Sequence, residues 1–93
     1  MYFATKDILL IMSLQKLFGQ KVKINRLAKG LTQEELAEQI DVSRQTLSQI
    51  ETGRRWLSAN KIERIVKILN IRYVDLFNFR SNINANHELK HFK

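Results

Sequence analysis

The chain has 93 residues, no cysteine and no proline, and its 16 lysines and arginines exceed its 9 acidic residues to give a net charge of +7. This composition excludes disulfide-stabilised and thiolate metal-binding proteins, and the length suits one small domain. The longest apolar run, residues 8–12, is too short to cross a bilayer, so we expect a cytoplasmic protein whose charge favours DNA, RNA or an anionic surface as partner.

The first predicted helix runs from residue 13 or 15 to residue 29 and stops at Gly30, a residue that accepts the left-handed conformation at a helix end. Its apolar side carries two stripes, which are Phe18, Val22 and Arg26, and Leu17, Ile24 and Leu27. One small core needs a single stripe. We therefore expect the second stripe to be covered by residues 7–12, by the C-terminal tail or by a second chain.

The second predicted helix begins at Thr32, where the sequence TQEE forms a capping box between the Thr32 hydroxyl and the Glu35 carboxylate. The helical pattern breaks at residues 41–43 and restarts with Ser43 as the N-cap of a third helix. Two helices joined by three residues cross steeply, and Ala37 supplies the small side chain that such a crossing needs. The pattern therefore predicts a helix-turn-helix unit, which offers its second helix to a groove.

The fourth predicted helix begins after Ser58 and ends at Asn70, and the fifth is short and lies near residues 73–79. The fourth helix is expected to bury four residues, Ile62, Ile65, Val66 and Leu69. No strand pattern competes over residues 13–79. We therefore predict an all-α, compact five-helix bundle over residues 14–79, with an N-terminal extension at 1–13 and a loose C-terminal tail at 80–93.

The outward face of the third helix carries amides, a hydroxyl and one cation, which are Arg44, Gln45, Ser48 and Gln49. A helix that faces only water usually carries paired Lys and Glu side chains instead. The B-DNA major groove is about 12 Å wide, and there Arg pairs with guanine and Gln with adenine. Alternatively, Arg44 contacts phosphate and Gln49 bonds back toward the preceding helix.

At these residues the chain resembles the phage-repressor or Xre-like helix-turn-helix family. The resemblance rests on GLTQEELAEQIDVSRQTLSQIETGRR and on NIRYVDLF, and it spans about residues 18–77. It implies a compact repressor-like bundle of five helices that binds DNA as a two-fold dimer. The chain departs from the family pattern at Asp41, where the family usually has Gly in the turn, and at Leu57, where it usually has Pro.

The resemblance also implies roles for residues outside the third helix. It places Gln33 beside the DNA backbone, and it implies a buried ion pair between Arg26 and Glu51. Further backbone contacts are expected from polar residues at helix starts and from cations after the third helix, namely Thr32, Arg54, Arg55, Asn60 and Lys61. Thr32 can alternatively be only a cap. The last predicted helix is unusually apolar, which indicates either core contacts or a dimer seam formed by Tyr73, Leu76, Phe77 and Phe79.

These observations predict a sequence-specific transcriptional regulator, a repressor that binds double-stranded DNA as a symmetric homodimer on a palindromic operator. One alternative is an antitoxin that also neutralises a toxin protein, and another is a restriction-modification controller; both would use the same helix-turn-helix. A third is nonspecific binding to nucleic acid or to an anionic membrane. No catalytic arrangement, metal site or phosphate-binding glycine loop is recognisable, so we expect no enzyme activity, no cofactor and no membrane partner.

Overall fold

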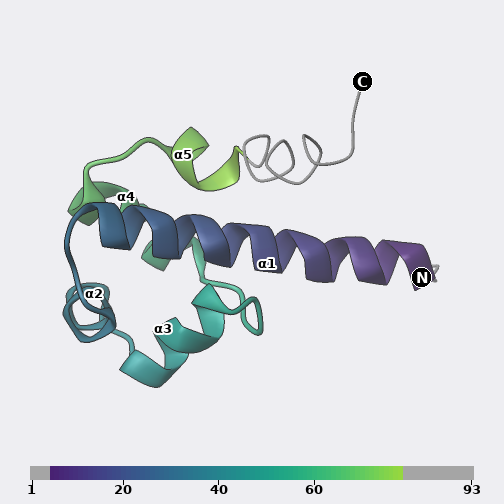
Figure 1. Ribbon diagram of the computed structural model, residues 1–93, viewed down its shortest axis with the longest axis horizontal. Coiled ribbons are helices and arrows are strands. Elements are labelled where there is room, and N and C mark those ends of the chain that lie inside the picture. Colours follow the sequence, from purple (N-terminus) through teal and green to yellow (C-terminus); the bar gives the residue numbers. More distant parts are fainter. Residues whose placement is uncertain (1–4, 79–93) are drawn as a thin grey trace.

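The computed structural model describes residues 5–78, and for residues 5–12 the backbone alone. The described chain forms five helices, α1 Thr5–Ala28, α2 Gln33–Gln39, α3 Arg44–Glu51, α4 Ala59–Leu69 and α5 Tyr73–Phe77. The long helix α1 runs across the molecule, with α2 and α3 on one side of it and α5 on the other (Figure 1). The all-α prediction is confirmed, and no strand interrupts the described range.

The start of α1 differs from the prediction. The helix begins at Thr5 rather than at residue 13 or 15. Residues 5–12 contain neither glycine nor proline and include several good helix formers, so no local signal ends the helix there. The prediction took the first core-facing residues as the helix start. The additional turns extend past the other helices, as the purple end of α1 shows (Figure 1).

The starts of α2, α3 and α4 are fixed by the predicted caps. The Thr32 hydroxyl accepts a hydrogen bond from the Glu35 amide at 3.1 Å, and the Glu35 carboxylate accepts one from the Thr32 amide at 2.8 Å. Ser43 and Ser58 each accept a hydrogen bond from the backbone amide three residues further on. Asn70 ends α4 in the left-handed conformation, with φ at 53°. These local bonds satisfy amides and carbonyls that a helix end would otherwise leave unpaired.

The turn between α2 and α3 is held by basic side chains from α4. Asp41 adopts the left-handed conformation, with φ at 60°, which aspartate tolerates better than most residues. Lys61 donates a hydrogen bond from Nζ to the Asp41 carbonyl oxygen at 3.2 Å, and Arg64 donates one to the Gln39 carbonyl oxygen at 3.1 Å. Helix α4 therefore fixes both the end of α2 and the turn that sets the direction of α3.

The core is built from one side of α1 and from the inner faces of the other helices. Its fully buried members include Phe18, Val22, Leu36, Ile40, Leu47, Ile50, Ile65, Leu69 and Leu76. On α4, Ile65 and Leu69 are buried as predicted, whereas Ile62 and Val66 pack against the core and stay partly exposed. The second α1 stripe lies outside this core, because Ile24 is 53% exposed.

Two glycines allow α1 to approach α3 and the loop after it at backbone distance. A Cβ on Gly19 would collide with the carbonyl oxygen of Ile50 and would lie 2.9 Å from that of Glu51. Gly53 has φ at +81°, and a Cβ there would lie 2.8 Å from the Cα of Lys16. The position of α3 relative to α1 therefore depends on the absence of these two side chains.

Helix α5 divides its apolar residues between the core and the surface. Leu76 is fully buried, so of the two roles left open for it the structure has the core contact. Tyr73 and Phe77 are 52% and 45% exposed, and Phe79 lies outside the described residues. The rings of Phe77 and Trp56 both pack on Phe18, with centroids 5.3 and 5.6 Å from it.

Candidate nucleic-acid interface

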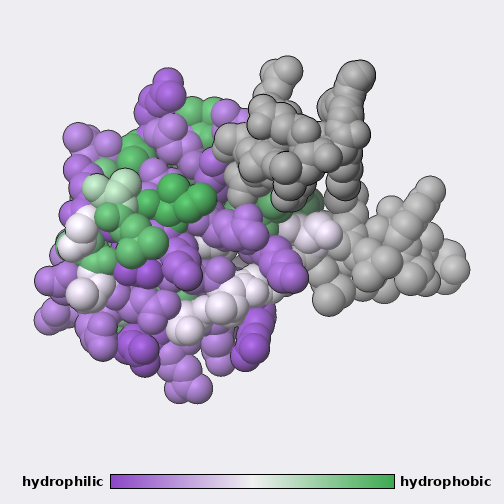
Figure 2. All heavy atoms as spheres, in the orientation of Figure 1, coloured by the Kyte–Doolittle hydropathy of each residue, from purple (hydrophilic) through white to green (hydrophobic). Residues whose placement is uncertain are grey.

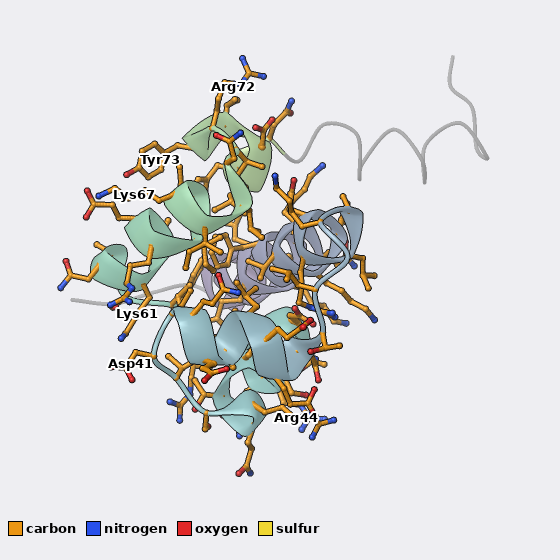
Figure 3. All side chains as sticks on the ribbon, turned by 90° about the vertical axis from the view of Figure 1, so that its left-hand side faces the viewer. Asp41, Arg44, Lys61, Lys67, Arg72 and Tyr73 are labelled. Carbon is orange, nitrogen blue, oxygen red and sulfur yellow. The ribbon has the colours of Figure 1, made fainter. Side chains whose placement is uncertain are left out.

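Helix α3 has one face in the core and one face in solvent. Leu47, Ile50 and Glu51 are buried, at the spacing that places residues on one side of a helix. Arg44 and Gln45 lie on the opposite side and are exposed. Figure 3 shows Arg44 at the edge of the molecule, pointing away from the bundle. The described residues thus leave the start of α3 open to a large partner.

Arg44 is exposed but has a partner. Its Nε lies 3.3 Å from Oε2 of Glu34 on α2, and the two side chains are 60% and 69% exposed. The terminal nitrogens of Arg44 make no hydrogen bond to any other described group, so they are free to bind an external acceptor. Sequence reasoning missed this contact, because among the acidic residues of α2 it gave a role only to Glu35, in the capping box.

The remaining predicted base-reading residues follow Arg44 along α3. Gln45 is exposed, whereas Ser48 and Gln49 are half-buried. Their side chains make no hydrogen bond to another group in the described part of the chain. The alternative role for Gln49, a structural bond back toward α2, therefore has no support in this region. All three side chains keep their donors and acceptors available.

A buried ion pair joins α1 to the end of α3. Arg26 donates from Nε to Oε2 of Glu51 at 2.7 Å and from Nη2 to Oε1 at 3.1 Å, a bidentate arrangement. Both residues are only 6% exposed. Arg26 also donates to the Leu31 carbonyl oxygen at 2.7 Å, and Gln33 donates from Nε2 to Oε1 of Glu51 at 3.0 Å. The pair thus fixes the start of α2 as well as the end of α3.

The residues predicted to contact the DNA backbone are in different situations. Arg54 and Arg55 follow α3, are exposed and have no ion-pair partner among the described residues. Asn60 is exposed at the start of α4. Thr32 uses its hydroxyl as a cap. Lys61 binds the Asp41 carbonyl and lies 3.9 Å from the Asp41 carboxylate, so its ammonium already stabilises the turn.

The surface around α3 agrees with a polar partner. In Figure 2 the part formed by α2 and α3 is hydrophilic or neutral, whereas hydrophobic residues gather near the end of α1 that joins α2.

Within residues 5–78 no group of three or more acidic, His or Cys side chains is arranged to hold a metal ion. None of the described helices combines the length and apolar character needed to cross a bilayer.

An exposed recognition helix, a turn fixed from behind and unpaired cations beside them together define a helix-turn-helix DNA-binding protein. A family model described as helix-turn-helix matches residues 22–76. The chain belongs to this Xre-like family of DNA-binding transcription regulators, which confirms the family and the class that the sequence predicted.

The chain is also similar to individual regulators that have a name or a solved structure. It is 43% identical over 68 residues to control protein C.BamHI of Bacillus amyloliquefaciens, a match that covers 72% of this chain and 84% of that protein. The restriction-modification controller C.AhdI of Aeromonas hydrophila has a TM-score of 0.64 and 35% identity, over 68% of this chain and 96% of that one. The clp gene regulator ClgR of Corynebacterium glutamicum has a TM-score of 0.71 and 28% identity, over 82% and 81%.

Proposed function

We propose that the chain is a sequence-specific transcriptional regulator of the controller type, which binds a near-palindromic operator as a symmetric dimer. The observation that carries this proposal is the exposure of Arg44 and Gln45 at the start of α3. The controller assignment is supported by C.BamHI and C.AhdI, because the matches cover 84% and 96% of those proteins. The site of action would be cytoplasmic DNA.

In the proposed complex, α3 enters the major groove with its N-terminal residues toward the base edges. The free terminal nitrogens of Arg44 pair with guanine, and the amide of Gln45 pairs with adenine; each good pair contributes about 1–3 kcal/mol of discrimination. Arg54 and Arg55 bind phosphates, and Gln33, which gives one Nε2 proton to Glu51, supplies a DNA backbone contact with the other. The phosphate contacts set the register of α3, while the base contacts select the sequence.

The dimer would place two copies of α3 in successive major grooves, about 34 Å apart. Its seam is proposed to include the exposed apolar residues of α5, which are Tyr73, Val74 and Phe77, at 52%, 48% and 45% exposed. A dimer seated on an operator that overlaps a promoter excludes polymerase. Repression is therefore the proposed direction of control.

The test is selection of bound sequences from a random duplex pool, followed by gel shifts on the selected operator. We expect enrichment of a near-palindromic sequence whose half-sites lie one helical turn apart. Arg44→Ala and Gln45→Ala should weaken specific binding while sparing the fold. Lys67→Ala is the matched control, since Lys67 is an exposed cation of α4 that lies far from Arg44 in Figure 3.

Two results would contradict the proposal. One is a pool without any enriched sequence, which would indicate nonspecific binding. The other is wild-type binding by both α3 variants. Light scattering on the protein purified from its own cells tests the antitoxin alternative. A dimer without other proteins supports the controller, whereas a stoichiometric second protein supports an antitoxin. A promoter–reporter fusion then measures the direction of control.

A further inference from the structure

The start of α2 places a carboxylate beside the arginine that is expected to read guanine. Arg44 is the first residue of α3 and Glu34 the second residue of α2, and their side chains meet between the two helices. Within the described chain the Arg44 guanidinium has one ionic contact, from Nε to Oε2 of Glu34 at 3.3 Å. The carboxylate thus engages the inner nitrogen and leaves the outer two without a partner.

This arrangement determines which edge of the guanidinium can meet DNA. Arginine can bind two acceptors either through its two terminal nitrogens or through Nε and one terminal nitrogen. With Nε held by Glu34, the terminal edge remains for O6 and N7 of guanine.

The same carboxylate acts against wrong contacts. A phosphate that approaches Arg44 meets a guanidinium whose charge is partly offset by Glu34, and it also meets the negative charge of Glu34 itself. Base edges are neutral and do not suffer this repulsion. A partner that repels incorrect contacts while permitting the correct one raises specificity without adding affinity.

We propose that Glu34 is a positioning residue that presents the terminal edge of Arg44 to guanine and weakens its binding to phosphate. This inference rests on the proposed function and adds to it a determinant of specificity on the first helix of the motif. The other acidic residues of α2 do not share this role. Glu35 bonds the Thr32 amide at 2.8 Å, and the Glu38 side chain makes no ion pair within the described residues.

The test compares Glu34→Gln with Glu38→Gln, which removes the same charge from the same exposed side of α2 without touching Arg44. The probes are the operator selected by the wild-type protein and a scrambled duplex of equal length. Glu34→Gln should lower the ratio of specific to nonspecific affinity about two- to fivefold, the range that exposed ion pairs span. Glu38→Gln should strengthen binding to both probes alike and leave the ratio unchanged.

Two further measurements make the result decisive. In an Arg44→Ala background, Glu34→Gln should behave like Glu38→Gln, because its target is gone. Without DNA, the Arg44 Nε–H signal in a nitrogen–proton NMR spectrum, assigned by its loss in Arg44→Ala, should shift in Glu34→Gln and not in Glu38→Gln. Two outcomes would overturn the inference. One is an equal effect of Glu34→Gln and Glu38→Gln on the ratio of specific to nonspecific affinity, and the other is an Arg44 Nε–H signal that does not shift in Glu34→Gln. A pool without an enriched operator would instead refute the proposed function, and the NMR comparison would still test the contact.

Discussion

The arginines of this chain have different roles because their surroundings differ. Arg26 is buried in a bidentate pair with Glu51, Arg44 is exposed and held at one nitrogen by Glu34, and Arg54 and Arg55 are exposed without a partner in the described chain. Because the Arg26–Glu51 pair is buried, its role is to stabilise the fold. Exposure leaves the others available to an anionic or hydrogen-bonding partner.

Breaking the buried pair should destabilise the fold severely. Glu51→Gln removes the charge that compensates Arg26, which is only 6% exposed. An uncompensated buried charge costs roughly 3–5 kcal/mol of unfolding free energy. Urea denaturation measures the loss, and Glu63→Gln, at an exposed glutamate of α4, should change stability by less than about 0.5 kcal/mol. The double variant Arg26→Met/Glu51→Met should lose less unfolding free energy than Arg26→Met and Glu51→Met lose in sum. Strict additivity would show that the two charges do not interact.

The exposed arginines should separate base reading from phosphate binding. Arg54→Ala should weaken binding to all duplexes alike and reduce the salt slope, the slope of log affinity against log salt, by about 1. Arg44→Ala should instead relax selectivity at one operator position, by about 1–3 kcal/mol. Both are measured by fluorescence anisotropy at four salt concentrations on cognate and substituted duplexes. If Arg44→Ala lowers the salt slope as much as Arg54→Ala and keeps selectivity, Arg44 binds phosphate.

At the scale of the helix, the position of α3 depends on backbone contact with α1. Gly19 lies where any side chain would strike the carbonyl oxygen of Ile50, and Gly53 closes the loop after α3 against Lys16. Helix α4 fixes the other end of the motif through Lys61 and the Asp41 carbonyl. The recognition helix is therefore held at its rear face and at the turn before it.

Adding one methyl group at Gly19 should therefore affect both stability and DNA binding. Alanine improves helix propensity by about 1 kcal/mol, but forcing apart a packed contact costs about 1–3 kcal/mol. We expect Gly19→Ala to be destabilised in thermal unfolding and also to bind the selected operator more weakly, because α3 must shift. Lys23→Ala, at an exposed position of the same helix, is the control for both. Unchanged affinity in a destabilised Gly19→Ala would show that α3 keeps its position.

The sequence predicted helix ends well where the signals were local. Thr32, Ser43, Ser58 and Asn70 act through bonds to residues nearby in the chain, so their patterns are readable. The start of α1 was mispredicted because no cap or breaker marks it. The contact between Glu34 and Arg44 was missed for a different reason, because it depends on how two helices approach one another. The sequence also predicted that Arg44 and Gln45 lie on the outward side of α3, because apolar residues mark the opposite side.

At the scale of the whole molecule, the exposed apolar residues form two candidate dimer interfaces. One seam uses α5 through Tyr73, Val74 and Phe77, and the other uses the uncovered α1 stripe, whose exposed members are Ile24 and Leu27. Phe77 also packs on Phe18, so changing it would disturb the core. Val74 and Ile24, at 48% and 53% exposed, are therefore the better positions for a test.

A charge buried at the true seam should dissociate the dimer. Val74→Glu should raise the dimer dissociation constant at least about tenfold, because an unpaired carboxylate would be desolvated on association. Ile24→Glu should leave the constant unchanged. Sedimentation equilibrium measures both, and circular dichroism checks that each variant is folded. The opposite pattern would place the seam on α1, and two unaffected variants would place it on neither surface.

The division of α3 into alternating buried and exposed residues has an evolutionary consequence. Leu47, Ile50 and Glu51 preserve the scaffold, while Gln45 and Gln49 meet no hydrogen-bond partner in the described chain. Gln45, which is exposed, can therefore be replaced without disturbing the buried contacts of α3. If Gln45 reads a base as proposed, single substitutions there would let related regulators recognise different operators on the same scaffold.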